Sequence, residues 1–311
     1  MSFPVVDFSA FTLDVEDICP ADLDRLSRDV KEAFTRVGFV FLDNTGVTQA
    51  EVDDVMEASR RFFLQPDRFK KAFIRKSVPN CPLHGWIPME TERVDPGTPA
   101  ADLKESFNMT SLHPDIKWPP SEVVAGFQET MTAFYQRCKE LSLRILKVIA
   151  HGLDLDPNVF LSAHRLIGND ENPTTLRSNY YPPVHREVAK EGQLRCGQHS
   201  DYGSITLLFQ DSEGLQVLEG SGEFITAPCI PGAILVNIAD MMQRWTSGQF
   251  VSLVHRVVLP PAGDSTTRQS LSFFLMPDDK AVVVCADGSD KYPPVQLGAY
   301  VAERLGYMYA Q

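Results

Sequence analysis

Apolar residues in the first part of the chain recur at helical spacing and predict two amphipathic helices. Residues 20–37 carry apolar side chains three and four positions apart, and Gly38 follows as a stop signal. Residues 39–42 then form a short apolar run that predicts a buried strand. Thr48 and Glu51 make a capping-box pattern ahead of the second apolar stripe, so we expect a helix to begin there.

A third apolar stripe predicts the longest helix of the chain. It begins near Ser121, after two prolines, and closes at Gly152. Ahead of it, the stretch 76–118 is rich in proline, glycine and charge and shows no period. A loop of that length in a compact protein often acts as a lid or a substrate-binding segment, which is the role expected here. The alternative is a surface insertion with no role in binding.

The pattern changes near residue 175, after which the apolar runs are short and rich in β-branched and aromatic residues. Clusters of Gly, Pro or Asp separate the runs, as in a sandwich or jelly roll of antiparallel strands. The expected strands are 204–210, 214–218, 233–238, 256–259, 271–276 and 281–285, and a final helix is expected over 297–305. These patterns divide the chain into a mostly helical N-terminal region (1–175), a β-rich core (176–285) and a C-terminal helix that packs on the core (286–311).

The length and charge of the chain restrict its partners. With 311 residues, 43% of them hydrophobic, it can bury one large core with a helical extension. The net charge of −12 argues against nucleic acid as the main partner, because phosphate binding needs a basic surface. The N-terminus shows no secretory signal, no apolar run is long enough for a membrane helix, and the six cysteines form no CxxC pair. We therefore expect a cytoplasmic protein that binds a small molecule, as a monomer or weak homo-oligomer.

Three residues of the β-rich region could hold a metal ion. His199 and Asp201 stand two positions apart, so on a strand both side chains point to one face, and His255 follows in a later β run. Two imidazoles and a carboxylate on one face of an octahedron leave three positions open, which suits iron(II) enzymes that bind a co-substrate and O2 at one metal. Zinc with an activated water, as in a hydrolase, could use the same three ligands.

A second group of residues distinguishes between the two metals because it offers a pocket for a carboxylate. Arg268 and Ser270 share one face of a β run, and a guanidinium with a neighbouring hydroxyl can bind one carboxylate. Asn179 and Tyr181 have the same spacing and could place an amide and a phenol along the same ligand. A carboxylate co-substrate beside the metal favours iron.

The order of these motifs resembles the isopenicillin N synthase-like branch of the 2-oxoglutarate- and iron(II)-dependent oxygenases. The resemblance covers most of the chain. The matching segments are 4–8, 37–40, 44–47, 102–107, 179–183, 197–206, 214–217, 231–232, 236–240, 252–257 and 268–270. The resemblance implies a mainly β fold with flanking helices, namely a double-stranded β-helix (jelly-roll) core with an N-terminal helical region.

The resemblance also implies roles for the residues named above. Iron(II) would be held by His199, Asp201 and His255, and 2-oxoglutarate by Arg268, Ser270, Tyr181 and Asn179. The reaction would use 2-oxoglutarate and O2, release succinate and CO2, and hydroxylate, desaturate or cyclise a small organic metabolite. The related halogenases have a small residue in place of Asp201, so its presence argues against halogenation. The implied reaction requires no general base from the protein.

Residues that meet the substrate are expected at the mouth of the barrel. The candidates are Phe273 and Phe274 on the strand that continues from Arg268, and Phe107 and Arg93 from the long loop. One departure from the family pattern follows residues 182–183, where the family often has Cys-Pro and a short link to the metal strand. Here His185 and Arg186 open a longer charged segment. We expect a solvated loop there, with an entrance for an acidic substrate as the alternative.

Two other functions are compatible with the same motifs. Some members of the family carry out oxidative ring closure or ethylene formation without 2-oxoglutarate and can keep an Arg-x-Ser pair. A non-catalytic small-ligand sensor on the same scaffold is the other, and the intact set of three metal ligands argues against it. Succinate formed together with product excludes the first, and iron-dependent O2 consumption excludes the second.

Overall fold

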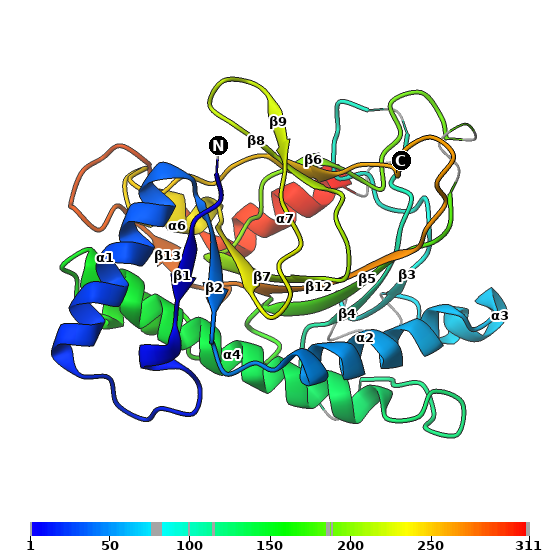
Figure 1. Ribbon diagram of the computed structural model, residues 1–311, viewed down its shortest axis with the longest axis horizontal. Helices are drawn as coiled ribbons and strands as arrows, with labels where there is room; N and C mark the ends of the chain where they lie inside the picture. Colours follow the sequence, from blue (N-terminus) through cyan, green and yellow to red (C-terminus); the bar gives the residue numbers. More distant parts are fainter. Residues whose placement is uncertain are drawn as a thin grey trace.

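Two β-sheets lie face to face and form the centre of the molecule in the computed structural model, which describes residues 2–75, 83–98, 100–113, 116–184, 187 and 189–308 (Figure 1). The large sheet has eight strands in the order β1-β2-β10-β7-β12-β5-β4-β3. All neighbours in it are antiparallel except β1 and β2. Its strands are β1 (Val5–Asp7), β2 (Phe39–Asp43), β3 (Gly85–Ile87), β4 (Glu105–Met109), β5 (Thr175–Tyr181), β7 (Ile205–Gln210), β10 (Ile234–Ile238) and β12 (Arg268–Leu275).

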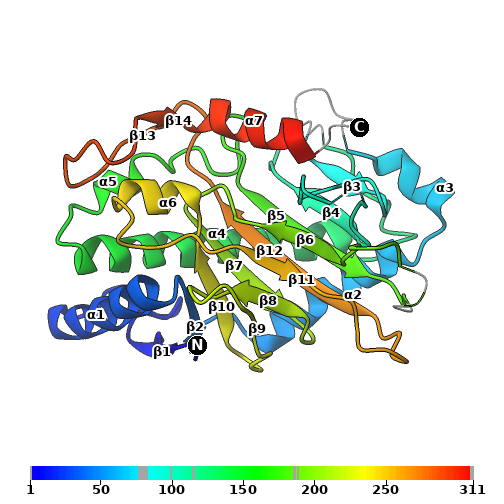
Figure 2. The ribbon, with the colours of Figure 1, turned by 90° about the horizontal axis from the view of Figure 1, so that it is seen from above.

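The second sheet is smaller and lies over the large one (Figure 2). Its four antiparallel strands, in spatial order, are β6 (Cys196–His199), β11 (His255–Val257), β8 (Leu215–Leu218) and β9 (Phe224–Thr226). A separate hairpin of β13 (Val282–Val283) and β14 (Val295–Gln296) leads into α7 (Leu297–Met308). This mainly β architecture with flanking helices confirms the expected fold class.

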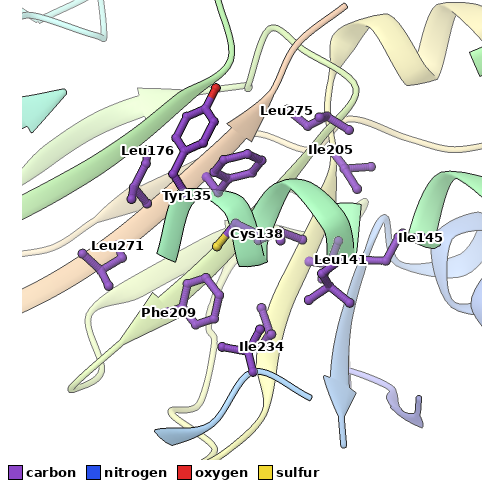
Figure 3. Close-up of a cluster of buried hydrophobic side chains, with 14 of the residues drawn as sticks. Tyr135, Cys138, Leu141, Ile145, Leu176, Ile205, Phe209, Ile234, Leu271 and Leu275 are labelled. Carbon is purple, nitrogen blue, oxygen red and sulfur yellow. The ribbon is translucent and has the colours of Figure 1, made fainter. Parts of the chain in front are cut away.

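Helices cover the outer face of the large sheet. They are α1 (Pro20–Arg36), α2 (Gln49–Phe63) and α4 (Phe127–Gly152), and the shorter helices of the chain are α3 (Asp67–Lys70), α5 (Asn158–Leu161) and α6 (Asp240–Trp245). Figure 3 shows the buried face of α4, where Tyr135, Cys138 and Leu141 lie among Leu176, Leu271 and Phe209 of the sheet. Side chains that recur every third or fourth residue along α4 are fully buried there, so this contact forms much of the hydrophobic core.

The first two predicted helices are confirmed, but the third begins later than expected. Thr48 and Glu51 form the predicted capping box at the start of α2. The longest helix, α4, begins at Phe127 and not near Ser121. Gly126 immediately before it has φ +70°, a left-handed conformation that breaks the helical path and leaves the preceding residues as turns.

The segment 76–118 contains secondary structure that the sequence pattern did not reveal. In its described part, β3 and β4 extend the edge of the large sheet. Both strands are short and almost fully buried on both faces, so they lack the alternation by which a strand is recognised. The large sheet therefore takes strands from both sides of residue 176, and the division of the chain there stays a prediction. Among the described residues, no helix is both long and apolar enough to cross a membrane.

Candidate metal centre and co-substrate pocket

The three candidate metal ligands converge between the two sheets. His199 ends β6 and lies directly opposite His255, which begins β11, because the two residues are paired across the antiparallel ladder. Asp201 follows in the loop, with Oδ1 3.8 Å from Nε2 of His199 and 3.7 Å from Nε2 of His255. One ligand atom from each residue lies within 4.8 Å of the others, a spacing at which all three can bind one ion.

Hydrogen bonds fix the orientation of both imidazoles. Nδ1 of His199 lies 2.9 Å from the carbonyl oxygen of Gly197, and Nδ1 of His255 lies 3.1 Å from that of Leu253. A carbonyl can only accept, so each Nδ1 carries the proton and donates it. This tautomer leaves the Nε2 lone pairs free to bind a metal, as is usual for histidine ligands.

The carboxylate of Asp201 is held in its ionised form. Its Oδ2 accepts hydrogen bonds from Oγ1 of Thr206 at 2.6 Å and Nδ2 of Asn237 at 2.8 Å, which leaves Oδ1 facing the histidines. Burial raises the pKa of Asp201, but the two imidazoles and these hydrogen bonds outweigh burial and place the pKa below its usual value. Burial, assisted by the nearby His255, lowers the pKa of His199 to about 4, so its imidazole is neutral at pH 7. Both protonation states are those that a metal requires.

A pocket of about 1180 Å³, measured to its open mouth, extends from these ligands between the sheets. Alternate residues of β5 and β12 form its floor, and Val301, Leu305 and Met308 of α7 form one wall. The floor residues are Thr175, Arg177, Asn179 and Tyr181 on β5, and Arg268, Ser270, Ser272 and Phe274 on β12.

The predicted carboxylate-binding residues meet at one end of this floor. Arg268 is the direct cross-strand partner of Tyr181, and Ser270 that of Asn179. Nε of Arg268 donates to the carbonyl of Ser212 at 3.1 Å, while Nη2 donates to Oε1 of Gln210 at 2.9 Å. Nη1 is buried and has no hydrogen-bond partner among the described residues. A buried guanidinium nitrogen that faces a pocket with no protein acceptor is suited to a carboxylate from a ligand.

A buried ion-pair cluster beside the pocket was missed at the sequence level. Lys104 lies 2.5 Å from Oδ2 of Asp102 and 3.4 Å from Oε2 of Glu92, and Arg177 donates two hydrogen bonds of 3.1 Å to Glu92. Both cations line the pocket. The motif around Lys104 indicated family membership only, because its partner Glu92 lies in a segment without a recognisable period.

The four candidate substrate residues have different environments. Phe274 lines the pocket. Phe273 does not, because neighbouring residues of a strand point to opposite faces, and its ring packs on Tyr135 of α4 at 5.2 Å. Phe107 is also fully buried away from the pocket, with its ring 5.1 Å from that of Phe62. The geometry therefore supports Phe274 and does not support Phe273 or Phe107.

Arg93 is partly buried and is not among the residues that form the pocket walls, although its neighbour Val94 is. Its backbone nitrogen donates to the carbonyl of Met308 at 3.3 Å, so this segment touches the end of α7. The segment 76–118 contributes Leu83, Val94, Lys104 and Asn108 to the pocket, which fits a substrate-binding segment. His185 and Arg186 lie outside the described residues.

Comparison with known proteins relates both halves of the chain to non-haem oxygenases. A family model for the 2OG-Fe(II) oxygenase superfamily matches residues 173–277, and one for the N-terminal region of "non-haem dioxygenase in morphine synthesis" matches residues 3–128. A 2-oxoglutarate-Fe(II) type oxidoreductase, ppzD, of Metarhizium rileyi is 30% identical over 96% of this chain and 91% of its own. A proline hydroxylase, buaE, of Petromyces alliaceus is 33% identical over 79% of each chain. The crystal structure of a full-length Neurospora crassa protein in complex with alpha-KG (2-oxoglutarate) and thymine is 32% identical, with a TM-score of 0.83 over 98% of this chain and 96% of that one.

Proposed function

Because the chain belongs to the 2OG-Fe(II) oxygenase superfamily, we propose that His199, Asp201 and His255 hold its iron(II). The protein is an enzyme, a non-haem dioxygenase that uses 2-oxoglutarate and oxidises a small organic metabolite. One observation supports the assignment of the ligands most strongly. Two imidazoles, each hydrogen-bonded through Nδ1 to a backbone carbonyl, and one ionised carboxylate present their remaining donor atoms to a common point at the base of the pocket.

Bound iron supplies the redox chemistry, in which O2 oxidises 2-oxoglutarate to succinate and CO2 and also oxidises the substrate. The chain's own residues bind, orient and exclude water. Hydrogen bonds from Thr206 and Asn237 keep the carboxylate of Asp201 in place, and backbone carbonyls do the same for the two histidines. The surrounding sheets bury Asp201 and His255, which limits their contact with bulk water.

Arg268 is proposed to bind the distal carboxylate of 2-oxoglutarate through Nη1, which no described residue engages. Ser270 and Tyr181 lie beside it on the same floor and can complete the hydrogen bonding. Asn179 is assigned a supporting role, because its amide already accepts from Ser106 at 2.8 Å and donates to Ser270 at 3.4 Å. It therefore fixes the position of the serine hydroxyl.

Lys104 does not serve as a general base, although it lines the pocket. Burial lowers its pKa, but the adjacent carboxylates of Asp102 and Glu92 outweigh burial and hold the pKa well above the usual value. The ammonium therefore stays protonated and paired. Its function is to hold the wall of the pocket together with Arg177, without transferring a proton.

The substrate is proposed to be a compact ring-sized molecule that lies against Phe274 and Tyr202. Both aromatic residues line the pocket, together with Pro173 and apolar residues of α7. Two relatives support this size class, since one structure holds thymine and another protein is named a proline hydroxylase. Aromatic and apolar walls favour stacking of a planar or cyclic molecule.

The test is a screen for small molecules that stimulate conversion of 2-oxoglutarate to succinate by the iron-loaded enzyme. Pyrimidine bases and cyclic amino acids form the first set. A substrate is a compound that raises succinate formation and is itself oxidised. Product formed without succinate would indicate a 2-oxoglutarate-independent oxidase, and binding without O2 consumption would indicate a sensor.

The location, oligomeric state and partners of the enzyme are proposed from its sequence. We propose that it acts in the cytoplasm as a monomer or weak homo-oligomer and binds no nucleic acid. The net charge of −12 supports the last point, because it disfavours contact with a phosphate backbone.

A further inference from the structure

We propose that Arg195 is a positioning residue for 2-oxoglutarate, a second buried cation that supports Tyr181 and Arg268 at the distal carboxylate. The inference rests on the proposed function, in which Arg268 binds that carboxylate. Arg195 immediately precedes β6 and does not line the pocket. It would therefore act through its charge and through the tyrosine that it contacts.

The two guanidinium groups share one aromatic ring. The central carbon of Arg268 lies 5.0 Å from the ring centroid of Tyr181, and that of Arg195 lies 5.9 Å from the same centroid. Both arginines are buried, with 1% and 3% of their surface exposed, and Tyr181 is also buried at 3%. At these distances each cation is attracted to the ring, so the pair restricts the position of the phenol.

Neither guanidinium has a carboxylate partner within the described part of the chain. Arg195 donates from Nη2 to the carbonyl of Thr266 at 2.5 Å, and its Nε is buried with no partner among those residues. Arg268 bonds there only to a carbonyl and an amide oxygen, and its Nη1 is equally unpartnered. Lys104 and Arg177, which line the same pocket as Arg268, are both paired with carboxylates. The lack of a paired carboxylate therefore distinguishes Arg268 and Arg195 from these two cations.

The carboxylates nearest to Arg195 are engaged elsewhere. Asp264 accepts from the backbone nitrogen of Thr266 at 2.8 Å, and Asp211 accepts from that of Gln269 at 3.0 Å and from the hydroxyl of Ser212. They act on Arg195 only at longer range. Burial and the charge of Arg268 lower the pKa of Arg195, and the opposing effects of Tyr181, Asp264 and Asp211 only partly compensate for them.

Two buried like charges that are not directly paired with a carboxylate are costly, and a bound anion lowers that cost. The distal carboxylate of 2-oxoglutarate is such an anion and, as proposed, contacts Arg268 directly. Arg195 then adds a second positive charge behind it. This charge favours a co-substrate with a distal carboxylate over a 2-oxo acid that lacks one.

The test compares the dissociation constants of 2-oxoglutarate and 2-oxobutyrate, which has the same keto acid end but no distal carboxylate. Binding is measured by calorimetry on the anaerobic iron(II)-loaded enzyme, with competition for the weaker ligand. Arg195→Met is expected to weaken 2-oxoglutarate binding roughly tenfold and to leave 2-oxobutyrate unchanged. Arg195→Lys, which keeps the charge, is expected to restore most of the preference for 2-oxoglutarate.

Arg244→Met is the matched control. Arg244 also lies over a tyrosine ring, at 5.3 Å from that of Tyr292, donates to one carbonyl and has an Nε that no described residue engages, but it lies outside the pocket. It should change neither constant. Arg195→Gln, which can still donate to Thr266, replaces the Met variant if the latter does not fold.

An unchanged preference in Arg195→Met (or in Arg195→Gln where it replaces the Met variant), or an equal loss for both ligands, would overturn the inference. Failure of the proposed function has a different signature. In that case Arg268→Met would also leave the preference unchanged, or the wild-type enzyme would not bind 2-oxoglutarate.

Discussion

The two faces of the large sheet are both buried, but they meet opposite requirements. The face toward α4 carries Leu271, Phe273 and Leu275 of β12, which pack into the hydrophobic core. The face toward the small sheet carries Ser270 and Ser272 from the same strand, and these line the pocket. One strand therefore supplies stability on one side and ligand binding on the other, by the alternation of its side chains.

The pocket face shows how a polar sheet face can be buried without a large loss of folding free energy. Most of its polar groups bond to one another, as Ser106 does with Asn179 and Arg177 with Glu92. Nη1 of Arg268, which no described residue engages, is the position where we propose that a carboxylate of the co-substrate completes the bonding. Substitutions on the pocket face should therefore impair function, whereas substitutions on the core face should lower stability.

The largest functional effect is expected for His199→Ala. Loss of one of three metal ligands should lower turnover by roughly three orders of magnitude or more and weaken iron(II) binding, while the melting temperature changes little. Metal titration and thermal unfolding measure the two effects. His151→Ala, an exposed histidine paired with Asp24, is the control. Tight iron(II) binding by the His199 variant would show that the ligand set is wrong.

Leu271→Ala tests the opposite face and should affect stability alone. Leu271 is fully buried against α4, so the cavity should lower the free energy of unfolding by about 3 kcal/mol. Urea unfolding measures the loss, and the KM for 2-oxoglutarate should stay within about twofold of wild type. Ser272→Ala, on the pocket face of the same strand, should cost less than about 1 kcal/mol. Equal losses of stability would contradict the distinction between the faces.

Arg268→Met should change co-substrate binding with little effect on the fold. Removing a buried charged donor from a carboxylate is expected to raise the KM for 2-oxoglutarate about a hundredfold, while kcat at saturation falls much less. Steady-state kinetics over a wide range of 2-oxoglutarate concentration separates the two constants. An unchanged KM would show that another residue binds the distal carboxylate.

The smallest effects are expected for two neighbouring phenylalanines. Phe273→Leu should reduce the free energy of unfolding by about 1 kcal/mol and leave the ratio of succinate to product unchanged. Phe274→Leu should preserve stability and raise the ratio of succinate to product. The smaller side chain holds the substrate less firmly against the pocket wall, so more 2-oxoglutarate is consumed without oxidation of the substrate. If Phe273→Leu raised the ratio instead, the assignment of the two faces would be reversed at this position.

Much of the fold could be predicted from local patterns. The capping box of Thr48 and Glu51, the first two helices and the β runs predicted for the second half were placed to within a few residues, whereas the longest helix begins later than predicted. The spacing of His199 and Asp201 was sufficient to suggest one metal site, because it brings both side chains to one face. The alternation of side chains along β12 also predicts that Phe273 points away from the pocket. Arg268 and Ser270 point into the pocket, so every second residue from them does the same and Phe273 lies on the other face.

The rest depends on contacts between distant segments. Nothing local pairs Lys104 with Glu92, or places Arg195 beside Tyr181, because these contacts exist only after the strands have assembled. The strands β3 and β4 were missed because burial on both faces removes the alternating pattern. The late start of α4 follows from the backbone conformation of Gly126, which the apolar stripe does not reveal.

The most direct test of the central claim measures succinate and oxidised product together, with the iron-loaded enzyme, O2, 2-oxoglutarate and a substrate from the screen. We expect the two to form in equal amounts, and we expect His199→Ala to form neither. Product without succinate, or undiminished succinate formation by the His199 variant, would contradict the central claim.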